Sequence, residues 1–124
     1  MVISIGHENI CCDTRETFEK ELSLRMASAS AEIWVSETGT REETPCIAVL
    51  LENDMAMLTY FNNDGESYVS VGDEKRDDGI EAFSAGQYEV WNYQIIKKDE
   101  ALAGLMDFFQ CKELPQSIKW ERVC

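Results

Sequence analysis

The hydrophobic pattern is clearest near the C-terminal end of the chain, where it predicts a helix followed by a strand. Asp99 and Glu100 would place negative charge in the first turn of that helix, and Lys112 positive charge near its last turn, as the helix dipole favours. We therefore expect a helix over residues 99–111 and a half-buried strand within residues 117–123. Six apolar residues recur at the spacing of one broad helix face: Ala101, Leu102, Leu105, Met106, Phe108 and Phe109.

A narrower stripe predicts a second helix near the N-terminal end. Asp13 has the form of an N-cap residue, with Glu16 three positions later. We expect a helix over residues 13–27 that lies on a sheet with its outer side in water. Three apolar residues recur one turn apart along it: Phe18, Leu22 and Met26.

Apolar segments separated by turn residues predict strands in the middle of the chain. Asn53-Asp54 suits a tight hairpin turn because both residues tolerate positive φ, and residues 62–65, which end in glycine, give a second turn signal. These segments therefore predict an antiparallel meander in the centre of a sheet. Its three strands would be residues 46–52, 55–61 and 67–71.

Alternation of apolar and polar residues predicts further strands at residues 2–5, 31–37 and 88–96. In residues 31–37, the side chain of Trp34 should point away from the aliphatic face. Either another element covers Trp34, which we favour, or the ring is exposed for a partner. Residues 72–86 have no periodicity and predict an exposed loop. Residues 88–96 are partly apolar on both faces, which is typical of a central strand.

Together these elements predict an α+β protein. We expect a mainly antiparallel sheet of about five to seven strands, with two helices (about residues 13–27 and 99–111) packed on it. A chain of 124 residues without an internal repeat or a linker composition should form a single domain over residues 1–124.

The charge is concentrated in one part of the chain. The net charge is −13, and residues 32–89 alone hold 14 acidic and 3 basic residues, a net charge of −11. Such a field disfavours binding to nucleic acid or to an anionic membrane surface and favours a basic partner. The plainer alternative is that the acidity only keeps the protein soluble.

The cysteines do not indicate a disulfide scaffold or a metal site. Five cysteines are an odd number, and none has the Cys-x-x-Cys spacing of zinc or redox sites. We expect free thiols in a reducing cytoplasm and no bound cofactor. The N-terminal residues 1–10 have neither a basic leader nor the apolar core of a signal peptide, so the protein should stay in the cytoplasm. A metal site formed by His7 with Cys11 and Cys12 is the alternative that we considered and did not favour.

No catalytic motif is recognisable. The single histidine, His7, would lie at the end of an N-terminal strand, and the Gly-x-Ser-x-Gly, phosphate-loop and dinucleotide-binding patterns are missing from the sequence. Adjacent carboxylates such as Asp77-Asp78 are more typical of a solvated loop than of general acid/base chemistry. The loop also lacks the ligand order of a calcium site. We therefore do not expect an enzyme.

Five segments stand out in the last third of the chain: Gly86-Gln87-Tyr88, Asp99 to Leu102, Asp107 to Phe109, Leu114-Pro115 and Ile118-Lys119-Trp120. Through these segments, this part of the chain resembles a family of bacterial immunity proteins from polymorphic toxin systems. That family includes the immunity protein of a double-stranded-DNA cytidine deaminase toxin. The first half of the chain is similar only loosely. Such proteins often have Gly after the helix where this chain has residues 111–113, so the helix end should differ in detail.

The resemblance implies a protein that binds a cognate toxin C-terminal domain, here a nuclease or nucleic-acid deaminase, and blocks its basic active-site region. Carboxylates would steer and pair with that region, and exposed aromatic side chains would anchor it. Each acidic residue taken singly also fits a solvated loop position. There are two alternatives. One is a small acidic regulatory or adaptor domain. The other is a ligand-binding or enzymatic domain with a pocket lined by Trp91, Tyr93 and Cys111. The candidate toxin-binding residues are Glu42, Glu43, Asp73, Glu74, Asp77, Asp78, Glu81, Trp34 and Trp91.

Overall fold

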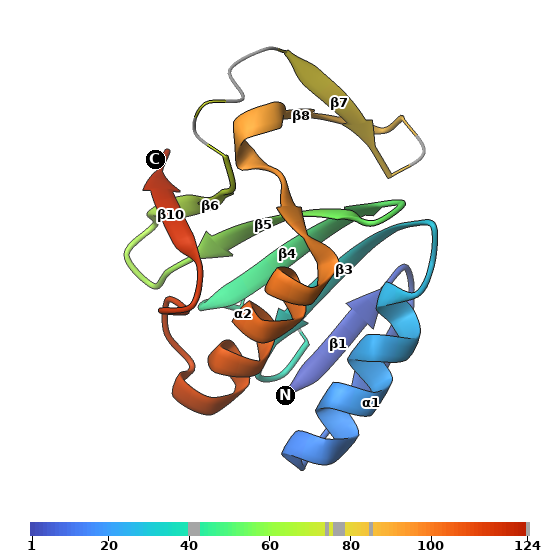
Figure 1. Ribbon diagram of the computed structural model, residues 1–124. Coiled ribbons are helices and arrows are strands. Elements are labelled where there is room, and N and C mark those ends of the chain that lie inside the picture. The colour runs from blue at the N-terminus through green and yellow to red at the C-terminus, as the bar shows by residue number, and fades with distance from the viewer. Residues whose placement is uncertain (40–42, 74, 76–78, 85, 124) are drawn as a thin grey trace.

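An antiparallel sheet with both helices packed on one of its faces forms the frame of the molecule (Figure 1). The computed structural model describes residues 1–39, 43–73, 75, 79–84 and 86–123. Within this described part, eight strands form the main sheet in the order β10-β6-β5-β4-β3-β1-β2, with β9 paired to β5 outside that path. Strands β7 and β8 form a separate two-stranded hairpin.

The elements follow one another along the chain as strands interrupted by two helices. The helices are α1 (Arg15–Met26) and α2 (Lys98–Cys111), and a short 3-10 helix, η1 (Asn92–Gln94), precedes α2. The predicted α+β class with two helices on an antiparallel sheet is confirmed. The strands are β1 (Val2–Ile5), β2 (Glu8–Cys11), β3 (Ser30–Ser36), β4 (Cys46–Glu52), β5 (Met55–Phe61), β6 (Ser67–Val71), β7 (Ile80–Phe83), β8 (Tyr88–Trp91), β9 (Ile96–Lys97) and β10 (Lys119–Arg122).

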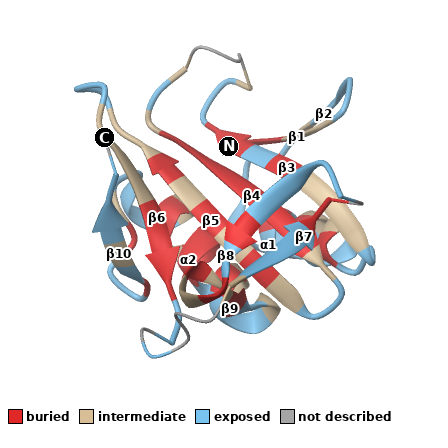
Figure 2. Ribbon diagram, turned by 90° about the horizontal axis from the view of Figure 1, so that it is seen from above, coloured by how far each residue is buried: buried red, intermediate tan, exposed pale blue. Residues whose placement is uncertain are grey.

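The main core lies between the two helices and the sheet (Figure 2). Helix α1 buries its three predicted residues. In helix α2, Leu102 and Phe109 are only half-buried, so the buried face is turned slightly from the predicted centre of the stripe. The ring of Phe109 stacks on Phe18 of α1 with centroids 4.9 Å apart, which joins the helices. The α2 side chains with no exposure are Ala101, Leu105 and Phe108.

The N-cap of α1 differs from the prediction, whereas α2 ends at Cys111 as predicted. Thr14, not Asp13, is the N-cap of α1, because its extended backbone lets Oγ1 accept a hydrogen bond from the backbone N–H of Thr17 at 3.2 Å. The C-cap of α2 is Lys112, which adopts the left-handed conformation with φ of 57° and donates its N–H to the carbonyl of Phe108. The right-handed helix thus ends with a single residue in the left-handed (αL) backbone conformation, which is a common helix C-cap. Lysine occupies this position, where glycine is the commonest residue.

The predicted meander is confirmed with the expected strand bounds. Strands β4, β5 and β6 pair consecutively, and β4 is buried along nearly its whole length in the centre of the sheet. Asn53 has a φ of 56° in the turn between β4 and β5, as the tolerance of asparagine for this region predicts. On the sheet face away from the helices, Leu50 packs with Phe83 and Val90 of the hairpin.

Three parts of the strand prediction are wrong. Residues 72–86 are not simply an exposed loop, because they contain β7. Strand β2 was not predicted, and it pairs with β1 through a turn in which Gly6 has a φ of 60°. Residues 88–96 are not one central strand, since β8 pairs with β7 outside the main sheet and only β9 joins β5.

Polar side chains between β8 and β9 explain this break. The Gln94 side chain accepts a hydrogen bond from the backbone N–H of Trp91 at 3.3 Å, and the backbone N–H of Ile95 donates to the carbonyl of Asn92 at 3.3 Å. These bonds replace a strand ladder with a 3-10 turn. The apolar residues on the two faces of the segment therefore serve two clusters: Val90 packs on the hairpin side of the sheet and Ile96 on the helix side.

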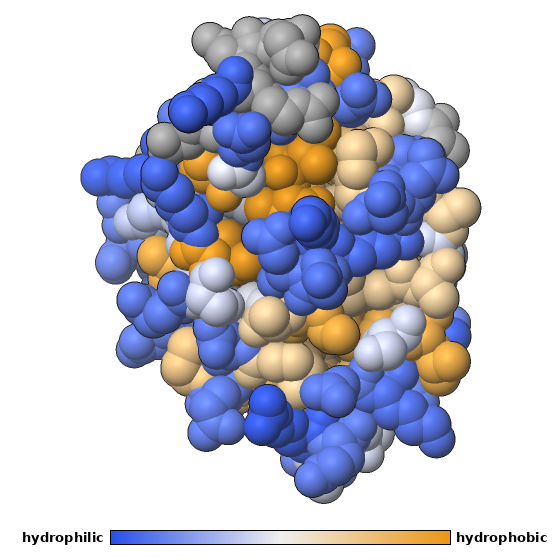
Figure 3. Space-filling model, in the orientation of Figure 1, coloured by the Kyte–Doolittle hydropathy of each residue, from blue (hydrophilic) through white to orange (hydrophobic). Residues whose placement is uncertain are grey.

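The outer surface on the helix side is mostly hydrophilic, with hydrophobic patches between the polar groups (Figure 3). This agrees with the exposed Glu19 and Lys20 on the outer side of α1. In the described part of the chain, neither helix is long and apolar enough to cross a membrane.

Candidate interaction groove

A groove of about 570 Å³ lies on the sheet face that the helices leave uncovered. Side chains alternate between the two faces of β3. Ile33 and Val35 point into the helix-side core, so Glu32, Trp34 and Ser36 point to the other face, where the groove lies. The hairpin covers the part of that face around Leu50 and contacts β3 beside the groove. The groove is lined by Ser4, Ile5, Gly6, Glu32, Trp34, Ser36, Gly39 and Cys46.

Trp34 forms an aromatic wall of this groove. Its ring stacks on Phe61, with centroids 5.8 Å apart and planes 13° apart, and the residue keeps 37% of its surface exposed. The favoured expectation that another element covers Trp34 is therefore wrong, because Phe61 belongs to the same sheet and covers only part of the ring. The alternative, an exposed ring that a partner can reach, agrees with the structure.

The carboxylate of Glu32 links the groove to the hairpin. Trp34 donates its Nε1–H to Glu32 Oε1 at 3.1 Å, and the Tyr88 hydroxyl lies 3.0 Å from each oxygen of the same carboxylate. The hydrogen bond and the negative charge of Glu32 raise the pKa of Tyr88. A second bond, from the Ser84 hydroxyl to the carbonyl of Ala31 at 3.0 Å, ties the hairpin to β3. These contacts hold the Glu32 side chain in one position.

The predicted site residue Glu43 lies near Cys46, which lines the groove, but Glu43 is not itself one of the lining residues. Its Oε2 accepts a hydrogen bond from the backbone N–H of Thr38 at 2.7 Å and another from the Thr38 hydroxyl. Burial raises the pKa of the Cys46 thiol to about 11, and the nearby Glu43 carboxylate adds to that increase. Of the two predicted site residues, only Trp34 therefore lines the groove.

The other predicted residues are elsewhere. Trp91 is 54% exposed on β8, directly opposite Ile80 of β7, which is 46% exposed. Glu81 is exposed on β7, and Asp73 is exposed after β6, where its carboxylate accepts the backbone N–H of Lys75. The two predicted aromatic anchors therefore lie on different surfaces. Four candidates are outside the described residues: Glu42, Glu74, Asp77 and Asp78.

The prediction missed Glu32, Tyr88 and Phe61. Period-two alternation places Glu32 on the same face as Trp34, so the sequence held a signal for it. Tyr88 is 56 residues from Glu32 in sequence, and only the position of the hairpin reveals their contact. Phe61 reaches Trp34 across an intervening strand, which sequence spacing does not indicate.

The pocket of the ligand-binding alternative does not coincide with this groove. Trp91 precedes η1, Tyr93 is within it, and Cys111 is exposed at the far end of α2 (Figure 1). None of these three residues is among those that line the groove.

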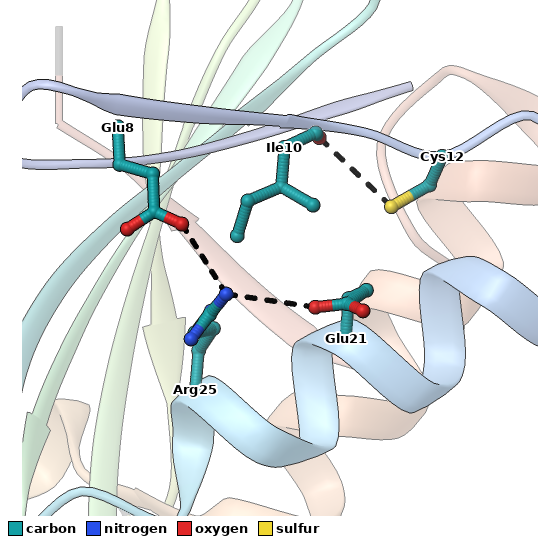
Figure 4. A network of polar contacts seen from close by, with 5 residues as sticks. All are labelled: Glu8, Ile10, Cys12, Glu21 and Arg25. Atoms are coloured by element: carbon teal, nitrogen blue, oxygen red, sulfur yellow. Dashed lines mark hydrogen bonds and ion pairs between the residues drawn. The ribbon is translucent and has the colours of Figure 1, made fainter.

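The three residues of the metal site considered from the sequence differ in burial. Cys11 and His7 are exposed, whereas Cys12 is buried with its Sγ 3.9 Å from the carbonyl oxygen of Ile10 (Figure 4). In the part of the chain that the structure describes, no group of three or more His, Cys, Asp or Glu side chains is placed to hold a metal ion.

The region around these cysteines is instead organised by an arginine. Arg25 of α1 forms two ion pairs, which Figure 4 shows. Its Nη2 lies 3.4 Å from Oε1 of Glu8 in β2 and 3.6 Å from Oε2 of Glu21. This bridge ties the edge strand to the helix, which is a structural role.

No protein-family model matches the chain, and a search of the curated proteins also returns no match.

Proposed function

We propose that this chain is an immunity protein that binds a cognate bacterial toxin domain, a nuclease or nucleic-acid deaminase, and occludes its basic active-site region. The observation that carries the proposal is the groove, which combines the exposed indole of Trp34 with the carboxylate of Glu32. The resemblance of the C-terminal third of the chain to immunity proteins supplies the role, and the net charge of −11 in residues 32–89 supports a basic partner.

Charge and aromatic anchoring would act at different stages of binding. The acidic field increases the rate of encounter with a positively charged surface, and this effect weakens with salt. A desolvated aromatic anchor slows dissociation, because burial of its ring removes apolar surface from water. An enzyme that acts on DNA or RNA needs a positive cleft for the phosphates, so an acidic protein that fills this cleft inhibits it without any chemistry of its own.

Protection in the cell tests this proposal directly. The toxin domain encoded by the gene next to that of this chain would be expressed from an inducible promoter, with and without the chain. We expect cells to survive only when the chain is present, and to form a complex that can be isolated with both proteins. Failure to protect against any toxin domain encoded beside the gene would contradict the proposal.

The electrostatic part has its own test. The association rate should fall as salt rises from low to physiological ionic strength. Reversal of charge at Asp77 and Asp78 should reduce the association rate more than the same reversal at Glu16 and Glu19, because the latter pair lies outside the acidic middle of the chain. Equal effects of the two pairs, or an association rate independent of salt, would contradict steering by this segment.

The adaptor alternative gives a different result. If the chain were an adaptor domain, a pull-down with it from the native host would recover a housekeeping protein. In that case, no toxin gene would lie beside the gene for this chain.

A further inference from the structure

We propose that the groove binds an arginine side chain of the partner, with the guanidinium stacked on the exposed indole of Trp34 and hydrogen-bonded to the carboxylate of Glu32. This inference depends on the proposed function only in taking the arginine from the toxin domain. It identifies which residues of a surface with many carboxylates make the specific contact.

The indole of Trp34 is prepared for such a contact. Phe61 stacks on the ring and the Nε1–H is bonded to Glu32, so two interactions fix its orientation. The exposed part of the ring lines the groove. Tryptophan is the side chain that attracts cations most strongly over its face, and the planar guanidinium can also stack on it. No ordering of the ring would be needed on binding.

Glu32 retains capacity to accept hydrogen bonds. It accepts one hydrogen bond from the Nε1–H of Trp34 and one from the Tyr88 hydroxyl. An ionised carboxylate has about four acceptor positions, so about two remain. Among the described residues, no Lys, Arg or His forms an ion pair with Glu32. A cation from a partner would therefore be its counter-ion.

The geometry favours arginine over lysine. The carboxylate and the indole are held side by side through the Nε1–Oε1 bond, so a flat group with donors along one edge can stack on the ring and also bond to the carboxylate. A guanidinium meets both conditions, whereas an ammonium group is a compact point charge. The remaining residues that line the groove carry no charge of their own, and Ser4 and Ser36 add hydroxyl groups to its wall.

Nuclear magnetic resonance can test the site without the toxin. The probe would be a blocked arginine, Nα-acetyl-L-arginine N-methylamide, compared with the corresponding lysine and citrulline compounds. Citrulline has nearly the same shape as arginine but no charge. The reporter is the indole Nε1–H signal of Trp34, assigned through Trp34→Phe. The indoles of Trp91, which is exposed, and Trp120, which donates to the carbonyl of Pro115 at 2.8 Å, are internal references.

We expect a saturable shift of the Trp34 signal with arginine, a weaker response to lysine, and no comparable response to citrulline. Glu32→Gln should weaken arginine binding by at least about tenfold, because a hydrogen bond to a charged group is lost while the amide oxygen can still accept from Trp34 and Tyr88. Glu89→Gln, which removes an exposed carboxylate on β8, should leave binding unchanged. Unchanged amide spectra would show that both variants fold.

Several outcomes would overturn the inference. A Trp34 shift as large with citrulline as with arginine would show that charge is not recognised. Equal affinity for lysine would leave a cation site without guanidinium selectivity. Equal binding by Glu32→Gln, or an equal shift at Trp91, would place the contact elsewhere.

A second measurement separates this inference from the proposed function. If the chain protects cells from the toxin and Glu32→Gln protects as well as Glu89→Gln, at equal expression and with equal complex affinity, the inference fails and the proposed function stands. If the chain gives no protection but binds arginine with the expected selectivity, the proposed function fails and the guanidinium site stands.

Discussion

The indole of Trp34 stacks on the ring of Phe61 although a whole strand separates the two residues in the sheet. Trp34 belongs to β3 and Phe61 to β5. On β4, between them, the residue opposite Trp34 is Ala48. Because alanine leaves the space above β4 open, the two rings can meet over it. The stack explains how a large apolar ring stays ordered on a face that no helix covers.

This stack should contribute measurable coupling to stability. We predict an interaction free energy of about 0.5–1.5 kcal/mol from a double-mutant cycle with Trp34→Ala, Phe61→Ala and the double variant, because stacked aromatic pairs contribute this much beyond their buried area. Urea unfolding of the four proteins measures it. Additive effects of the two substitutions would show that the rings are neighbours without a stabilising contact.

Gly104 provides a second prediction, in the helix-side core. A Cβ at this position would lie 2.7 Å from Ile118 Cγ1 and 3.5 Å from Leu58 Cδ1. In an exposed helix, Gly→Ala stabilises by about 1 kcal/mol. Here we predict that Gly104→Ala destabilises by about 1–3 kcal/mol, because the added methyl overfills a packed site.

The same unfolding experiment contains a control for the cause. Ile118→Ala removes the atoms that the new Cβ would meet, so its cost should be smaller in the Gly104→Ala protein than in the wild type. A stabilising effect of Gly104→Ala alone would show that the close approach of α2 to Ile118 is not required.

The elements predicted well from sequence are those whose pattern and environment agree. The strands β4 and β5 and their turn at Asn53 were predicted with the correct bounds, because a continuous apolar run and a turn residue both point to a central hairpin. Helix α2 was also predicted correctly, because its apolar stripe packs in the helix-side core. The alternation in residues 88–96 misled the prediction, because apolar residues on two faces were taken to face one sheet, while Val90 and Ile96 belong to two different clusters.

The candidate site was predictable only in part. The alternation of β3 places Trp34 opposite the aliphatic residues Ile33 and Val35, so its direction followed from the sequence. The partners of that ring did not. Phe61 and Tyr88 reach it or its neighbour Glu32 from other elements, and those contacts depend on strand order and on where the hairpin packs. Charge along the chain likewise indicated an acidic middle but not which carboxylate is positioned by hydrogen bonds.

Tyr88 should hold the hairpin to the main sheet. We predict that Tyr88→Phe increases the hydrogen-exchange rates of the backbone amides of β7 and β8, since the variant loses the bond to Glu32 and keeps the one from Ser84 to Ala31. Exchange in β4 should not change. Tyr68→Phe, which removes a hydroxyl from β6, is the matched control. Equal protection of the hairpin in both variants would show that the Tyr88–Glu32 bond does not restrain it.

Cys46 should make stability depend on pH in the alkaline range. Burial, with a smaller effect from the Glu43 carboxylate, raises the pKa of its thiol from 9.0 to about 11. The folded protein therefore binds the thiol proton more tightly than the unfolded chain does. The stabilising contribution is complete below pH 9 and is lost as the pH rises from 9 to 11. Two pKa units correspond to at most about 2.7 kcal/mol.

Comparison with Cys46→Ala isolates this effect from the other groups that titrate in the same range. The pKa values of Cys12, Tyr60 and Tyr88 are also raised, but these groups are present in both proteins. In urea unfolding with reductant, the wild type should lose more free energy of unfolding between pH 8 and pH 10.5 than Cys46→Ala does. Cys11→Ala, which removes an exposed thiol, should follow the wild type. If Cys46→Ala loses stability in parallel with the wild type, Cys46 ionises in the folded protein as easily as in the unfolded chain, and the groove is more open to water at this point than the buried thiol indicates.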